Sequence, residues 1–157
     1  MSGQYAKETS VSVEKSKMEI ERTLMRYNAT GFFTAWQENP PMSAIGFQLE
    51  GRTMRIEMPM PLKGERRFTH SSRGPRSKDG ALKAWEQAQR QRWRALLLII
   101  KAKLEFVECG LSTVEKEFMA DVLLPDGTRL GESILPQIKA SYASGKMPPL
   151  LPPPKED

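Results

Sequence analysis

Apolar and polar residues alternate most strictly over residues 44–58. Apolar side chains occupy every second position on both sides of the dipeptide Glu50-Gly51, namely Ile45, Phe47 and Leu49, then Met54, Ile56 and Met58. A two-residue period is typical of a strand, because successive side chains point to opposite faces, and glycine suits a tight turn. The pattern therefore predicts a β-hairpin over 44–58 with one buried face.

A helical period follows between about residues 81 and 109. Apolar residues recur there every three or four positions, at Leu82, Trp85, Ala88, Trp93, Leu96, Leu97, Ile100, Leu104 and Val107. Gly110 is well suited to end the helix. The first half of this segment is polar and the second half is apolar on nearly all sides. We expect one long helix whose C-terminal half lies in the core and whose N-terminal half projects toward solvent or a partner.

The remaining segments predict shorter elements. Ser16 and Glu19 form a capping box that predicts a helix to about Tyr27, and the aromatic run 31–37 predicts a strand. A second capping box after Gly110 predicts a short helix to about Met119, followed by a strand over 120–124 and a helix over about 131–143. Residues 62–80 have little periodicity and several glycines, which predicts a long exposed loop.

Together these elements predict an α+β fold. A small antiparallel sheet, built on the 44–58 hairpin, would pack on the long helix (about 81–109), with short helices flanking it. We expect a flexible N-terminus over 1–15 and a single domain over 16–146 that contains the basic loop 62–80. The Pro-rich tail 147–157 is expected to be extended and polyproline-like.

The charge of the chain is concentrated in one block. The 157 residues carry a net charge of +5, yet residues 59–108 alone hold twelve basic and five acidic side chains. The segment before this block is neutral and the segment after it is net negative. Such a block is typical of a polyanion-binding surface, although a solvated loop that keeps a protein soluble has the same composition.

Within this block, the loop interleaves basic residues with hydroxyls and one aromatic residue. Guanidinium groups and hydroxyls bind phosphates, and an aromatic ring offers a face on which a base can stack. Two arginines lie four positions apart on the following helix, so they share a face and would extend the phosphate track. The predicted nucleic-acid-binding residues are Arg66, Arg67, Phe68, Arg73, Arg76, Lys78, Arg90 and Arg94. Trp85 and Trp93 could also stack on bases, but their place in an apolar stripe favours the core.

The sequence carries no motif for catalysis, for a cofactor or for a metal. It has no Gly-x-Ser-x-Gly and no phosphate loop, and a single Cys109 with a single His70 cannot supply a structural zinc site. We expect Cys109 to be buried and inert, and His70 to be solvated. A non-enzymatic protein without a cofactor is therefore expected.

No apolar run approaches the roughly 18 to 20 residues that a membrane span needs. The polar N-terminus lacks the hydrophobic region of a secretory signal. We therefore expect no membrane partner and a cytoplasmic location.

Two segments carry a resemblance to a known group. Residues 87–110, with Gln-Arg-Trp-Arg-Ala-Leu-Leu-Leu-Ile-Ile-Lys, and residues 115–152, with Leu-Pro-Asp-Gly and Gly-Lys-Met-Pro-Pro-Leu-Leu-Pro, resemble small uncharacterised proteins of tailed phages and prophages. The resemblance covers most of the chain from about Ser16. It implies a phage protein acting in the host cytoplasm and brings no established activity.

The order of elements carries a second likeness. A hairpin, a basic loop and a long helix with a basic start are similar to the core of RecT/Redβ-type single-strand annealing proteins. This likeness implies a protein that binds single-stranded DNA as a homo-oligomer.

We therefore expect a non-enzymatic nucleic-acid-binding protein, with single-stranded DNA favoured, in phage replication or recombination. The alternative is a protein-interaction module, a phage inhibitor or adaptor of a host protein. That module would act through the projecting helix and the Pro-rich tail.

Overall fold

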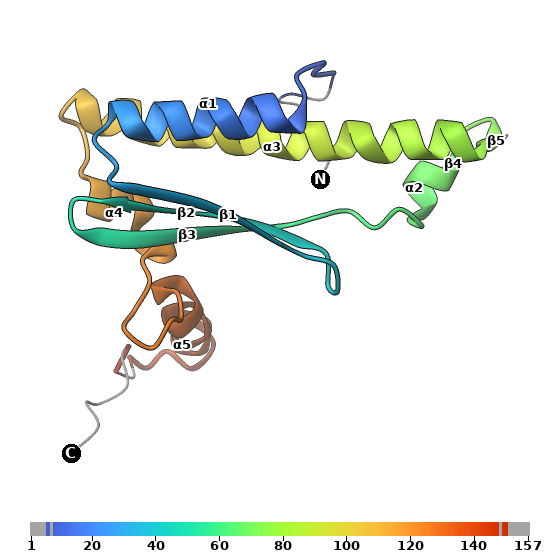
Figure 1. The fold of residues 1–157 in the computed structure, drawn as a ribbon. Coiled ribbons are helices and arrows are strands. Elements are labelled where there is room, and N and C mark those ends of the chain that lie inside the picture. Colours follow the sequence, from blue (N-terminus) through green and yellow to red (C-terminus); the bar gives the residue numbers. More distant parts are fainter. Residues whose placement is uncertain (1–5, 7, 148, 151–157) are drawn as a thin grey trace.

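The computed structural model describes residues 6, 8–147 and 149–150, and its elements follow the α+β pattern predicted from the sequence (Figure 1). In chain order they are α1 Val13–Arg26, β1 Gly31–Gln37, β2 Met42–Leu49, β3 Arg52–Pro59, α2 Arg66–Thr69, β4 His70–Ser71, β5 Gly74–Pro75, α3 Lys78–Glu108, α4 Val114–Phe118, the 3₁₀ helix η1 Met119–Asp121 and α5 Leu130–Ser144.

The main sheet is antiparallel, with the strand order β1-β2-β3. Ile45 pairs with Ile56 across β2 and β3, so the alternating apolar residues of the two strands share one face. Glu50 and Gly51 turn the chain with φ values of 50° and 74°. The predicted hairpin and the predicted strand over 31–37 are confirmed.

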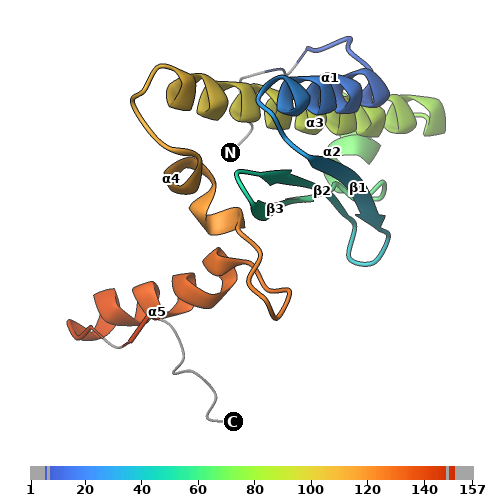
Figure 2. The same cartoon turned by 60° about the vertical axis from the view of Figure 1, so that its left-hand side comes forward.

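One face of the sheet is covered by α1 and α3, which lie side by side and run in the same direction (Figures 1 and 2). The buried side chains of α3 all come from its C-terminal half and are Trp93, Leu96, Leu97, Ile100 and Leu104. Phe118 of α4 closes one end of this core, since its ring meets that of Phe47 edge to face with centroids 5.4 Å apart. The single core thus lies between the sheet and one half of the long helix.

Helix α1 begins earlier than its sequence predicts. The hydroxyl of Ser12 accepts a hydrogen bond from the Lys15 amide at 3.1 Å, and Ser12 has the extended backbone of a helix cap. Ser16, the predicted cap, is instead fully buried inside the helix. Before the helix, the Thr9 carbonyl accepts a hydrogen bond from the side-chain amide of Gln87 in α3 at 2.9 Å.

The predicted long loop over 62–80 is exposed at most of its positions, as expected, but it is not a continuous loop, because it contains α2 and the short β4–β5 hairpin. The long helix also begins at Lys78 rather than near residue 81. Its cap is Ser77, whose hydroxyl accepts a hydrogen bond from the Gly80 amide at 3.1 Å. These elements build one end of the molecule, at the N-terminus of α3 (Figure 1).

The prediction of a strand over 120–124 is also wrong. Its first residues belong to η1, and Val122 and Leu123 form only isolated bridges, to Met54 and Arg129. The predicted helices around this segment are confirmed as α4 and α5, with Pro136 inside α5. The predicted Pro-rich tail lies largely outside the described residues.

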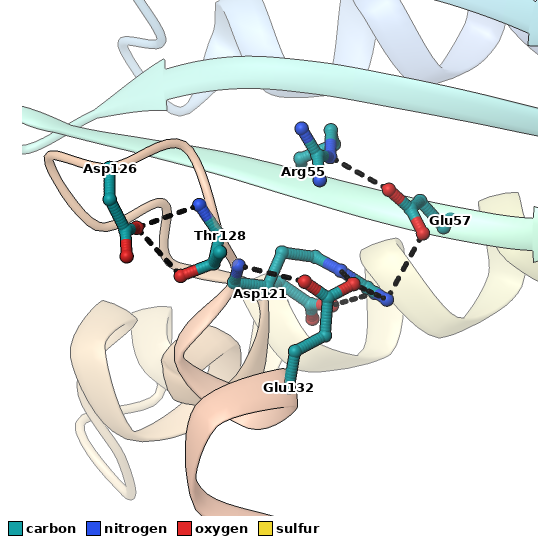
Figure 3. Close-up of polar contacts among 7 residues, drawn as sticks. Arg55, Glu57, Asp121, Asp126, Thr128 and Glu132 are labelled. Carbon is teal, nitrogen blue, oxygen red and sulfur yellow. Dashed lines mark hydrogen bonds and ion pairs between the residues drawn. The ribbon is translucent and has the colours of Figure 1, made fainter. Parts of the chain in front are cut away.

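Ion pairs at Arg129 fasten the start of α5 to the sheet (Figure 3). The Arg129 guanidinium lies 3.1 Å from Glu57 of β3 and 2.8 Å from Glu132 of α5. Asp121 is 3.9 Å away, and its burial raises its pKa against the opposing charges of Lys103 and Arg129. Beyond this anchor α5 stands away from the sheet, and none of its side chains is fully buried (Figure 2).

Leu97→Ala tests the role of α3 as the base of the core. Leu97 is fully buried, so truncation should lower the free energy of unfolding by about 2–5 kcal/mol, as measured for other buried leucines. Leu82→Ala, on the exposed N-terminal half of the same helix, is the matched control and should have a much smaller effect. Urea denaturation measures both, and equal losses would contradict the placement of the core.

Candidate nucleic-acid interface

Helix α2 is short, and specific side chains hold it in place. Glu65 precedes it, with one carboxylate oxygen accepting a hydrogen bond from the Leu62 amide at 2.7 Å. The other oxygen lies 2.6 Å from Nε of Arg67. Phe68 is buried, with 4% of its surface exposed, and anchors the helix. The Arg67 guanidinium lies 4.6 Å from the centroid of the Phe68 ring.

The burial of Phe68 corrects the role that its sequence context suggested. A ring that stacks on a base must present a free face, and this ring is enclosed by its own domain. Phe68 is therefore a packing residue that anchors α2.

The Arg76 side chain also forms hydrogen bonds within the fold. Its guanidinium donates hydrogen bonds to the carbonyls of Arg67 at 2.8 Å and Phe68 at 3.0 Å. The Arg76 amide donates a further hydrogen bond to the Thr69 carbonyl at 2.8 Å. Because the last carbonyls of a helix lack partners within it, Arg76 closes the C-terminus of α2.

Three of the predicted residues remain exposed, and among the described residues none of their side chains forms an ion pair or a hydrogen bond. They are Arg66 on α2, Arg73 in the turn between β4 and β5, and Lys78 at the start of α3. We call this set the basic end. Here the structure brings together charges from three separate elements.

Arg90 and Arg94 share one face of α3, as predicted, but that face lies against α1. The Arg94 guanidinium is 3.0 Å from the Glu19 carboxylate. Arg90 donates hydrogen bonds to the Gln87 side chain at 2.6 and 3.0 Å. The expected extension of the phosphate track along these two arginines is therefore not formed in this structure.

Arg92, two residues away from each of them, lies near Arg67 and Glu65 instead. Burial lowers the pKa of its guanidinium, and the nearby charge of Arg67 lowers it further, while Glu65 opposes both.

A groove of about 610 Å³ lies next to the chain that leads into α2, and its lining along that chain ends at Gly64, two residues before Arg66. It lies between the β1–β2 turn, the chain that leads from β3 to α2, and the exposed half of α3. Trp36, Met60, Lys63, Trp85 and Gln89 are among its lining residues. Trp85 is held by a 2.8 Å hydrogen bond from its indole nitrogen to the Pro61 carbonyl, and the Lys63 ammonium lies 4.5 Å from its ring.

Trp36 is the residue that sequence reasoning missed. It is 79% exposed although it belongs to the face of β1 that turns toward the helices. Strand alternation accounts for the face on which Trp36 lies, but no local pattern shows that β1 extends past the buried part of α3.

The described residues show few other features that could support catalysis or metal binding. No group of three or more His, Cys, Asp or Glu side chains among them could hold a metal ion. His70 lies 2.9 Å from the Thr69 hydroxyl. Cys109 is exposed, which corrects the expectation of a buried thiol. None of the helices in the described ranges is long and apolar enough to cross a membrane.

Comparison of the chain with protein-family models, with curated proteins and with solved structures found no match.

Glu19→Gln tests the ion pairs that join α1 to Lys101 and Arg94 of α3. The hydrogen bond from Lys101, together with the charges of Lys101 and Arg94, holds the pKa of Glu19 below its ordinary value, against the effect of burial. A carboxylate whose pKa is lower in the folded state stabilises the fold at pH values above its unfolded-state pKa. This stabilisation is lost as the pH falls through its folded-state pKa. The variant should therefore be less stable than the wild type by about 0.2–1 kcal/mol at pH 7, the range of partly exposed ion pairs.

The stability difference should vanish in acid, where Glu19 is protonated in both states. Urea denaturation across this pH range measures it. Glu21→Gln, an exposed site on α1 without an ion pair among the described residues, is the control. A difference that persists unchanged in acid would contradict the ion-pair assignment.

Proposed function

We propose that this chain is a non-enzymatic nucleic-acid-binding protein that favours single-stranded DNA. The observation that carries the proposal is the basic end, where Arg66, Arg73 and Lys78 are exposed without carboxylate partners among the described residues. Basic side chains without such partners are available to phosphates, and the release of counterions from the nucleic acid drives their binding.

The groove next to the chain that leads into α2 supports the preference for single strands. Bases in a duplex are stacked on one another, whereas unpaired bases can stack on protein side chains. Trp36 presents a largely free indole ring at this groove. We propose that the basic end binds the backbone phosphates while Trp36 stacks on an unpaired base.

The biological setting is a further part of this proposal. The resemblance of residues 87–110 and 115–152 to small phage and prophage proteins supports a place in phage replication or recombination. The order of hairpin, basic segment and long helix supports a role like that of single-strand annealing proteins.

A second candidate function is a protein-interaction module, an inhibitor or adaptor of a host protein. Helix α5 favours it, because this helix has no fully buried side chain and exposes Leu135 and Tyr142. The two candidates differ in a mobility-shift assay with short oligonucleotides at two salt concentrations. Only a nucleic-acid-binding protein should bind the oligonucleotides by itself, with an affinity that depends on salt.

The triple variant Arg66→Ala/Arg73→Ala/Lys78→Ala tests the phosphate contacts. The affinity for oligo(dT) should fall, and the slope of log K against log salt should flatten by about 2, since each phosphate contact on a single strand contributes about 0.7. Fluorescence anisotropy at four or five salt concentrations measures both quantities.

The matched control removes three exposed charges elsewhere, in Arg22→Ala/Lys139→Ala/Lys146→Ala. It has the same net charge as the triple variant and should retain the wild-type slope. If the two variants have equal slopes, the basic end is not the binding site.

Trp36→Ala tests the stacking contact. Loss of one stacked base should weaken oligo(dT) binding about fivefold or more, whereas Trp36→Phe should retain most of the affinity. The salt slope should not change, because no charge is removed. An oligomer of the same length without bases should bind wild type and Trp36→Ala equally, and weaker binding by the variant would argue against stacking.

A further inference from the structure

The outer side of α3, opposite the core, carries an exposed apolar stripe. A helix advances 100° per residue, so Ala95 and Ala102 lie diametrically opposite the buried residues of the same helix. Leu98 flanks these alanines on one side, and Ile99 and Phe106 flank them on the other. We call these five residues the outer stripe.

The outer stripe is unusually exposed for a set of apolar side chains. Leu98, Ile99 and Phe106 are 36%, 52% and 45% exposed. No charged residue interrupts the stripe, although 27% of the chain is charged. A contiguous apolar surface of this kind marks an interaction site.

The spacing of the outer stripe suits a second helix. Two alanines seven residues apart form its centre, and seven residues are two helical turns of a coiled-coil seam. Alanine lets two helix backbones approach closely, while the larger flanking residues close the sides of the contact. The partner surface is therefore another apolar helix face.

We propose that this partner is the outer stripe of a second copy of the chain, packed antiparallel. A twofold axis between Leu98 and Ile99 would place Leu98 against Leu98 of the second copy and Ile99 against Ile99. It would also place Ala95 against Ala102. The stripe is thus complementary to itself, as the interface of a twofold dimer requires.

Charge determines the direction of pairing. Lys78 begins α3, and Arg66 and Arg73 lie beside that end. A parallel dimer would bring the two basic ends together, where like charges repel. An antiparallel dimer places them on opposite sides of the axis, about 60 Å apart at 1.5 Å per helical residue.

Polar residues at the edges of the stripe fit the same arrangement. The antiparallel pairing brings Gln91 of one copy beside Glu105 of the other, where the amide can donate a hydrogen bond to the carboxylate. It also brings Arg92 beside Phe106 of the second copy, a cation–π combination. Neither contact depends on nucleic-acid binding.

Sedimentation of the full chain at 1–100 μM tests the proposal. Wild type should show a concentration-dependent dimer. Ile99→Glu should remain a monomer, because the twofold axis would place the two carboxylates together, and Ala95→Arg should do the same by blocking the close approach. Leu82→Glu, on the same helix but outside the outer stripe, should dimerise like wild type, and circular dichroism should show that all the variants are folded.

Cross-linking determines the orientation of the two α3 helices in the dimer. In a Cys109→Ser background, Leu98→Cys should form a disulfide dimer under mild oxidation, because the two introduced thiols meet near the axis. Native Cys109 should not, since two copies of it lie about 30 Å apart in the antiparallel dimer. A monomeric wild type at 100 μM, a dimer that Ile99→Glu leaves intact, or a Cys109 disulfide in place of the Leu98→Cys one would each overturn the proposal.

Discussion

The packing of one half of α3 against the sheet and α1 is the interaction on which the other elements depend. Every buried side chain of this 31-residue helix lies between Trp93 and Leu104. The sheet, α1 and α4 all rest on that half, and the preceding fifteen residues contribute no fully buried side chain. The same helix therefore serves as the base of the core and as an arm that carries α2 and the β4–β5 hairpin away from it (Figure 1).

This division explains why basic residues close together in sequence have different roles. Arg94 lies beside α1, where Glu19 neutralises it, and Arg76 satisfies carbonyls at the end of α2. Arg66 and Arg73 are exposed and form no ion pair with a carboxylate among the described residues. Charge density in the sequence thus overestimates the charge available for binding, because part of it neutralises or caps the fold itself.

The elements that could be predicted from sequence are those fixed by local periodicity. The 44–58 hairpin and the long helix were placed within three residues at each end, because alternation and helical spacing report which side chains share a face. The structure of residues 62–80 depends on distant contacts, such as the burial of Phe68 and the hydrogen bonds of Arg76. The exposure of Trp36 likewise depends on where β1 extends past the core, which no local pattern contains.

The uneven burial along α3 gives one continuous helix two different local stabilities. Amide groups in its C-terminal half are protected by packed side chains, so they exchange with solvent only through large-scale unfolding. Those nearer Lys78 lie beside side chains that are only partly buried, so we expect this arm to open at a smaller free-energy cost than the core. The molecule thus contains a cooperative unit whose order can change while the core stays intact. The boundary between this unit and the core falls inside α3 and not at a loop.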